Sequence, residues 1–299
     1  MNYTTEIDTI VLQIDFFNLR EKKKTEDEIL IYLRNIGLYI KEEMNTYSGY
    51  GLMYTAYLNN SILFRITSGS FNTYTSSGFI SKSYISIKFA GLKTYSLNKD
   101  RRSFHHLINL CSFCNSRNIL FKITELDICI DVRCLFKNML AMCVKKSPKT
   151  KYYDIGEEQK FSGQTTYIEK FKTKKKSDTA VLRSYLYDKS HKEDLDFPLT
   201  RFELKLQPKF FNKYDFNINS IEKALDRYYL MYFNDVKLKN SKVNAYNNYS
   251  VFRKREIKRQ KLDNFRLTPD LNYIQYFLFL IRNINHNNYN YFLYFWNLY

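Results

Sequence analysis

Three short segments of the chain alternate between apolar and polar residues with a period of two, which is the pattern of a β-strand with one apolar face. They are Ile123–Asp131, Val181–Lys189 and Thr200–Leu206. Because successive strand side chains point to opposite faces, Glu125, Asp127 and Asp131 share one face of the first segment, and the other face is apolar. The first segment therefore predicts a strand with an acidic face.

The other two segments carry tyrosines and basic residues on their polar faces. These residues are Arg183, Tyr185, Tyr187 and Lys189 in the second segment, and Arg201, Glu203 and Lys205 in the third. If the three strands share one sheet, the polar faces would form an acidic metal site beside tyrosines and cations, which suits phosphodiester chemistry on nucleic acid. The alternative is an antiparallel sheet whose polar face contacts only water.

The remaining pattern predicts further strands and helices. Strands are expected at Val11–Phe16, Met53–Leu58, Ile62–Ile66 and Tyr84–Phe89, and a hairpin is expected between Thr165–Phe171 and Val181–Lys189. Helices are expected at Thr25–Ile40, Ser103–Asn115, Leu135–Lys146 and Ser220–Phe233. Thr25 and Glu28 have the spacing of a capping box, and Ser220 is the expected cap of the last helix. The pattern predicts an α+β fold with a central antiparallel sheet flanked by helices.

A change of composition near Asn217 predicts a domain boundary at that point. Residues 1–216 would hold the predicted strands, and residues 217–299 would form a helical, basic and aromatic C-terminal region.

The charge balance indicates a polyanionic partner. The chain has 299 residues with 47 Lys and Arg against 30 Asp and Glu, a net charge of +17, and its 44% hydrophobic content is ample for a core. A net positive charge of this size attracts nucleic acid, which is a polyanion. The alternative is a generally basic protein whose Lys, Asn, Tyr, Ile and Phe content comes from an AT-rich genome.

Two basic clusters and one strand residue are candidates for contacts with DNA. The first cluster lies in the loop of the predicted hairpin, at Lys172, Lys174, Lys175 and Lys176. The second comprises Arg253, Lys254, Arg255, Lys258, Arg259 and Lys261, and Arg183 is the strand residue. A solvated loop and a solvated helix face are the alternatives for the two clusters.

The five cysteines and the hydropathy of the chain indicate a reduced compartment. No stretch reaches the length of an apolar membrane span, and the N-terminal residues do not follow the pattern of a secretory signal, so a cytoplasmic location is expected. Cys111 and Cys114 form a lone C-x-x-C without the second pair that a zinc site needs, which favours cysteines in a helical core.

Five short motifs in a fixed order give the chain a resemblance to a known family. They are Tyr47-Ser48-Gly49-Tyr50-Gly51, the strand Ile85–Gly91, the series Thr124, Asp127 and Asp131, the triplet Tyr187-Asp188-Lys189 followed by Glu193, and the pair Arg201 and Glu203. The order and spacing of these motifs resemble those of the replication initiators of rolling-circle plasmids, the group typified by small staphylococcal plasmids. This group also includes phage replication initiation factors and some conjugative relaxases.

This resemblance implies a nuclease fold and a tyrosine that cuts one DNA strand at a replication origin and stays attached to the 5′ phosphate. The family tyrosine directly precedes the Asp/Asn-Lys pair, so Tyr187 is the expected nucleophile. The family usually has Arg two residues earlier, where this chain has Tyr185, which makes Tyr185 the second choice. Glu193 lies one residue later than the usual acid.

The expected mechanism is a hypothesis built on these residues. Asp127 and Glu203, with Asp131 or Glu125, would hold Mg²⁺ or Mn²⁺ through oxygen ligands. Lys189 and Arg201 would add positive charge at the phosphate while Tyr187 attacks in line. The products would be a phosphotyrosine and a 3′ hydroxyl that can prime a polymerase.

The resemblance also implies partners and leaves alternatives. It implies a replication origin that is single-stranded at the nick, a host helicase and a homodimer, with residues 1–216 as the nicking and origin-binding domain. A conjugative relaxase with the same chemistry is one alternative. A DNA-binding protein on the same fold without catalysis is the other.

Overall fold

The structure is a computed structural model of the chain. It describes residues 3–44, 52–75, 78–93, 95, 103–143, 153–154, 165–167, 182–213, 217–239, 241 and 265–283. Two compact units are present: the first unit comprises Met1–Glu6 and Asp127–Gln275, and the second unit comprises Ile7–Leu126 and Tyr276–Tyr299. The predicted boundary between residues 216 and 217 falls inside the first unit.

The second unit contains an antiparallel meander in the strand order β2-β3-β4-β5-β1. These strands are β1 (Tyr3–Phe16), which begins in the first unit, β2 (Tyr39–Met44), β3 (Leu52–Leu58), β4 (Ser61–Thr75) and β5 (Gly78–Ala90). Neighbouring strands pair antiparallel, with registers such as Ile14 opposite Ile85. The four strands predicted in this part of the chain are confirmed, and each is longer than its pattern indicated.

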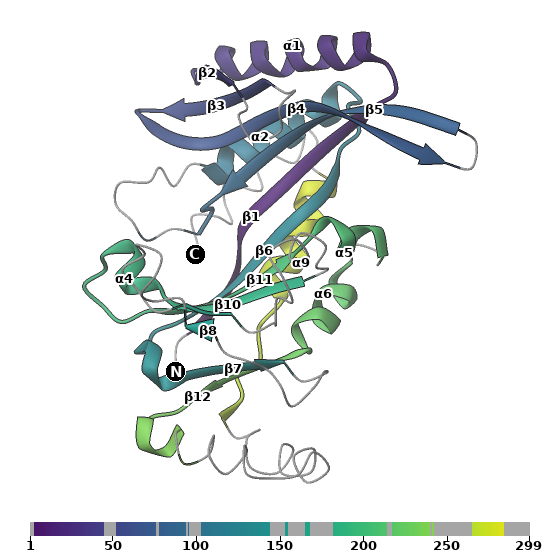
Figure 1. Ribbon diagram of the computed structural model, residues 1–299. Coiled ribbons are helices and arrows are strands. Elements are labelled where there is room, and N and C mark those ends of the chain that lie inside the picture. Colours follow the sequence, from purple (N-terminus) through teal and green to yellow (C-terminus); the bar gives the residue numbers. More distant parts are fainter. Residues whose placement is uncertain are drawn as a thin grey trace. The chain divides into compact units, whose positions relative to one another are not determined.

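Two helices of the second unit pack through their apolar faces. Figure 1 labels both helices, α1 (Leu19–Asn35) and α2 (Ser103–Ser116). Helix α1 buries Ile29, Leu30 and Leu33, and α2 buries six apolar residues. The Tyr32 ring stacks on Phe113, with ring centroids 4.2 Å apart. The prediction of α2 is confirmed.

The start and the end predicted for the first helix, Thr25 and Ile40, are both wrong. The Asn18 side chain caps α1 by accepting a hydrogen bond from the Arg20 amide at 2.8 Å, and Thr25 lies inside the helix. The chain leaves the helix at Ile36, where Gly37 takes a φ of +86° that favours glycine, and residues 39–44 form β2.

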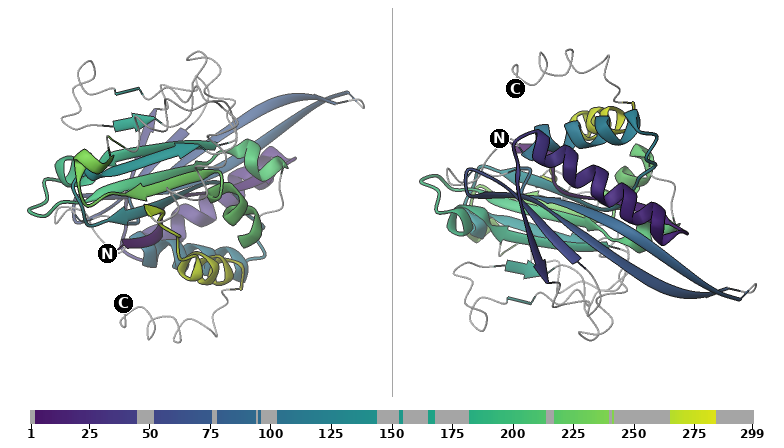
Figure 2. Two further views of the ribbon diagram at one scale, coloured as in Figure 1. Left: turned by 90° about the horizontal axis from the view of Figure 1, so that it is seen from below. Right: turned by 90° about the horizontal axis from the view of Figure 1, so that it is seen from above.

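The first unit contains the strand order β6-β11-β10-β9-β8. These strands are β6 (Lys122–Val132), which begins in the second unit, β8 (Tyr153–Asp154), β9 (Thr165–Tyr167), β10 (Leu182–Asp188) and β11 (Thr200–Leu206). Figure 2 shows these strands from two further sides. The predicted β11 is confirmed at both ends, and the pairing of β10 with β9 confirms the described part of the predicted hairpin.

A second sheet of two strands replaces two predicted helical regions. Strand β7 (Met139–Cys143), after the short 3₁₀ helix η1 (Phe136–Asn138), pairs antiparallel with β12 (Tyr228–Tyr232). The helix predicted at Leu135–Lys146 is therefore wrong, and the helix predicted at Ser220–Phe233 is correct only over its first part. Helix α6 (Ile218–Leu225) covers that part, and its cap is Asn217, so the prediction of Ser220 as the cap is wrong.

Three further helices belong to the described residues. They are α4 (Lys189–Glu193), α5 (Pro208–Lys213) and α9 (Asn272–Asn283). The α+β class with an antiparallel sheet and several helices is confirmed.

The buried side chains agree with the apolar faces that the sequence predicts. Leu126, Ile128 and Ile130 of β6 are at most 1% exposed, and so are Cys111 and Cys114 of α2, as expected for core cysteines. Within the described residues, no helix has the length and hydropathy to cross a membrane.

Candidate active site

Strands β6, β11 and β10 lie side by side in the first unit with their polar residues on a common face. The register places Tyr187 opposite Arg201 and Tyr185 opposite Glu203. Ion pairs join Arg201 to Asp131 and Lys205 to Asp127. The residue number rises along β11 as it falls along the neighbouring β6, so the two strands are antiparallel. The sheet therefore brings together the three polar faces that the alternation indicated.

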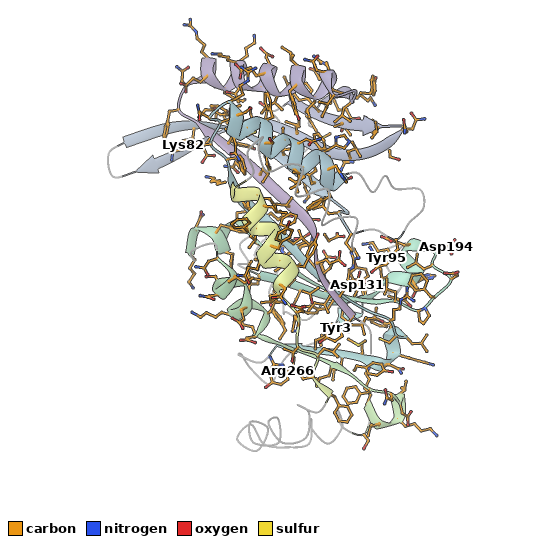
Figure 3. All side chains as sticks on the ribbon, turned by 180° about the vertical axis from the view of Figure 1, so that it is seen from behind. Tyr3, Lys82, Tyr95, Asp131, Asp194 and Arg266 are labelled. Atoms are coloured by element: carbon orange, nitrogen blue, oxygen red, sulfur yellow. The ribbon has the colours of Figure 1, made fainter. Side chains whose placement is uncertain are left out.

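This polar face is buried. Asp127 and Arg201 are 0% exposed, Asp131 is 3% exposed and Tyr187 is 6% exposed. Figure 3 labels Asp131 among the side chains of this region. A face that contacts only water does not describe this part of the sheet. Buried charges must be paired, and each of those named has a partner.

Tyr187 and Glu203 are joined by a hydrogen bond. The Tyr187 hydroxyl donates to Glu203 Oε2 at 2.9 Å, which is a diagonal contact between neighbouring strands. The Lys192 ammonium lies over the Tyr187 ring, 4.7 Å from its centroid. A phenol therefore lies between a carboxylate that can accept its proton and a cation.

The Lys205 ammonium contacts two carboxylates. Its Nζ lies 2.5 Å from Asp127 Oδ2 and 3.3 Å from Glu203 Oε1. Burial alone would lower the pKa of Lys205, but the charges of Asp127 and Glu203 raise it well above its ordinary value. The side chain is therefore a cation at neutral pH.

Arg201 and Asp131 form a bidentate ion pair. Arg201 Nε and Nη2 donate to Asp131 Oδ1 and Oδ2 at 2.6 and 2.7 Å. Both carboxylate oxygens of Asp131 are engaged, and the guanidinium faces this partner within the sheet. A bidentate pair of a guanidinium and a carboxylate fixes the relative orientation of the two groups and brings their opposite charges together.

The triplet Tyr187-Asp188-Lys189 marks the end of β10 and the start of α4. The Asp188 carboxylate accepts a hydrogen bond from the His191 amide at 3.0 Å, which caps the helix. Lys189 is 4% exposed and forms an ion pair with Glu193 one helical turn later. The predicted phosphate contact of Lys189 stays a prediction, because its ammonium is engaged by Glu193 in this arrangement.

Tyr185, the second-choice nucleophile, lies directly opposite Glu203. Burial raises the pKa of Tyr185, and the nearby Lys205 and Arg183 lower it by less. The raised pKa makes the phenolate of Tyr185 harder to form at neutral pH. Arg183 hydrogen-bonds to Tyr185 and lies opposite Lys205 on β11.

The carboxylates predicted as metal ligands each contact a cationic side chain. Lys88 contacts Glu125 at 3.0 Å, Lys205 contacts Asp127 and Glu203, and Arg201 contacts Asp131. Among the residues that the structure describes, no group of three or more His, Cys, Asp or Glu side chains is placed to hold a metal ion. As they are arranged here, these four carboxylates do not fit a divalent cation, and their role as ligands stays a prediction.

Several of the predicted contact residues lie outside the described residues. They are the Tyr47–Gly51 motif, the hairpin-loop lysines Lys172, Lys174, Lys175 and Lys176, and the basic cluster from Arg253 to Lys261.

Two cations of the site have no chemical role in the prediction from sequence. The alternation places Lys205 on the polar face with Arg201 and Glu203, but it does not show that Asp127 is its partner. Lys192 lies five residues after Tyr187 in α4, and no periodic pattern connects it to the strand face.

No protein-family model and no curated protein matches the sequence. Among solved structures, the chain is similar to a rolling-circle replication initiator protein from Geobacillus stearothermophilus, with a TM-score of 0.40 and 12% sequence identity. The match covers 77% of this chain and 87% of that chain. This similarity is too low to assign a function, so the functional argument depends on this chain's own residues.

Proposed function

We propose that this protein initiates rolling-circle DNA replication by nicking and rejoining one strand of an origin, with Tyr187 as the nucleophile. The observation that carries the proposal is the hydrogen bond from the Tyr187 hydroxyl to Glu203, within a buried face that also holds Lys205. The ordered motifs that contain Tyr187 and Glu203, and the net charge of +17, support the same conclusion.

In the proposed reaction Glu203 acts as the general base. A phenol has an ordinary pKa near 10, so it needs a base to become a good nucleophile at neutral pH. Tyr187 Oη attacks the phosphorus atom while its proton passes to Glu203 Oε2, and the bond from phosphorus to the 3′ oxygen breaks. The 3′ oxygen takes a proton from water and becomes a free hydroxyl, and the 5′ phosphate stays on the tyrosine.

Lys192 is the cation that we assign to the scissile phosphate. Its side chain is exposed, and its ammonium already lies over the Tyr187 ring. A phosphate can reach the hydroxyl only when side chains around Tyr187 move, because Tyr187 is 6% exposed. Arg201 then acts by holding Asp131 and the β6–β11 register.

The link between phosphate and tyrosine conserves the energy of the phosphodiester. A later attack by a 3′ hydroxyl on the phosphotyrosine restores the strand and frees Tyr187, so rejoining needs no nucleotide cofactor. The 3′ hydroxyl released by the first cut is the primer for replication.

The resemblance of the motifs carries the remaining parts of the proposal. They are single-stranded origin DNA as the substrate, a homodimer, a host helicase and a cytoplasmic location, whereas the Mg²⁺ or Mn²⁺ that the resemblance implies is left out of the proposed reaction. No step above uses a metal, because the four predicted ligands are engaged by Lys and Arg side chains.

The test uses labelled single-stranded oligonucleotides that tile the DNA flanking the protein's own coding sequence. Incubation with the full chain, once with Mn²⁺ and once with EDTA, should give a labelled protein band that persists in detergent. Tyr187→Phe should abolish the band and Tyr185→Phe should keep it. If Tyr187→Phe keeps the band, the assignment of the nucleophile is wrong.

The same experiment separates the alternatives. A conjugative relaxase would give the same band with DNA from a transfer origin and none with DNA from a replication origin. If the protein binds DNA in a salt-sensitive way but gives no covalent band with Mn²⁺ or with EDTA, it is a DNA-binding protein without nicking activity.

A further inference from the structure

The Lys205 ammonium lies where a cation shared by Asp127 and Glu203 would lie. Its Nζ is 2.5 Å from Asp127 Oδ2 and 3.3 Å from Glu203 Oε1. These are the two carboxylates that the sequence predicts as the main metal ligands. A divalent ion bound by the same oxygens at about 2.0–2.6 Å would need the volume that the ammonium fills.

The burial of these groups makes a cation at this point necessary. The Asp127 side chain is 0% exposed, that of Glu203 is 10% exposed and that of Lys205 is 25% exposed. A carboxylate without water around it needs a positive partner, and the chain supplies this partner from its own strand. Asp131, the next carboxylate of β6, is engaged in the same way by Arg201.

The two oxygens of Glu203 have different partners. Oε1 faces Lys205, and Oε2 accepts the hydrogen bond from the Tyr187 hydroxyl. The contact with Lys205 therefore fixes the orientation in which the other oxygen meets the phenol.

We propose that Lys205 is a built-in cation that takes the place of a divalent metal ion between Asp127 and Glu203, and that it orients Glu203 toward Tyr187. Lys205 is a positioning residue, since it acts on the phenol through Glu203. Its role in orienting the base rests on the proposed strand-cutting function. The replacement of the metal does not rest on it and can be tested on the protein alone.

The first experiment measures Mn²⁺ binding to the full chain by electron paramagnetic resonance of free Mn²⁺. Wild-type protein should leave the free signal unchanged at equimolar Mn²⁺. Lys205→Ala should bind Mn²⁺ at least about tenfold more tightly than wild type, because it removes a positive charge from between Asp127 and Glu203. Lys88→Ala is the matched control: it also removes a lysine from a predicted ligand, Glu125, and should gain no affinity.

A further variant keeps the test decisive if Lys205→Ala does not fold. Lys205→Ala combined with Asp127→Asn removes both buried charges and should fold without binding Mn²⁺. Tight binding of one Mn²⁺ by the wild-type protein, lost in Asp127→Asn, would overturn the proposal. So would a folded Lys205→Ala protein with no gain in Mn²⁺ affinity.

The second experiment measures the covalent band with single-stranded DNA. Wild type should form the band in EDTA, and Lys205→Ala should form it only when Mn²⁺ is added. Lys205→Arg should keep the behaviour of wild type. A wild-type band that requires Mn²⁺ would contradict the proposal and leave Tyr187 as nucleophile intact. Mn²⁺ binding as predicted with no band from any variant would instead contradict the proposed function.

Discussion

The bidentate pair of Asp131 and Arg201 predicts a large and specific loss of stability. Asp131→Asn keeps the shape of the side chain but removes the negative charge that faces the Arg201 guanidinium, which is 0% exposed. Removing one partner of a buried ion pair costs about 3–5 kcal/mol, against a total stability of about 5–15 kcal/mol for a typical domain. The variant should therefore lose about a fifth of its stability or more.

The assay is urea-induced unfolding of wild type and variants, followed by far-ultraviolet circular dichroism. Asp226→Asn is the matched control in the same unit. Asp226 also pairs with an arginine, Arg266, at 3.3 Å, but the Asp226 side chain is 66% exposed. Exposed pairs contribute about 0–1 kcal/mol, so this control should change little.

The double replacement Asp131→Leu with Arg201→Met completes the test. Removing both charges removes the cost of an unpaired group, so the double variant should recover most of the stability lost by Asp131→Asn. A loss below about 1 kcal/mol in Asp131→Asn would refute the reasoning, because a loss that small is typical of exposed pairs.

Three further outcomes are expected from the described residues. Asn18→Ala should destabilise the protein by about 0.5–2 kcal/mol in urea unfolding and Thr25→Ala should not, because Asn18 is the observed cap of α1. Burial raises the pKa of Cys114 to about 12, so this thiol should react with a disulfide reagent at pH 8 only after unfolding, and fast reaction in the native state would contradict its burial. Burial and the charge of Glu26 raise the pKa of Tyr54 to about 12. The stability that the protonated Tyr54 phenol contributes should therefore be complete below pH 10 and lost as the pH rises to about 12. Unfolding measured as a function of pH should show a smaller loss in Tyr54→Phe.

The strands that carry the site could be predicted from the sequence because their two faces differ so strongly. β11 matches its pattern at both ends, since Gln207 and Pro208 cannot extend a central strand. The period-two alternation of strand side chains was enough to place the carboxylates of β6, the tyrosines of β10 and the basic residues of β11 each on one face of its strand.

The pairing of these groups could not be predicted, because it depends on the register between strands that are distant in sequence. A single strand does not reveal that Lys205 will meet Asp127 or that Arg201 will meet Asp131. The expectation of a shared metal followed from seeing the carboxylates without their partners.

The wrong helices have physical causes of the same kind. Residues 139–143 and 228–232 pair with each other in the second sheet, and this tertiary pairing overrides a helical pattern of apolar residues. The wrong start of α1 arose because Asn18 and Glu21 have the same capping-box spacing as Thr25 and Glu28 but lie seven residues earlier in the chain.

The central claim is that the Tyr187 oxygen becomes linked to DNA, and mass spectrometry of the linked peptide tests it most directly. After nuclease and trypsin digestion of the protein–DNA adduct, the peptide Ser184–Lys189 contains both candidate tyrosines, and fragmentation distinguishes them. The account predicts a nucleotide phosphate on Tyr187. A nucleotide on Tyr185, or an adduct on any other peptide, would contradict it.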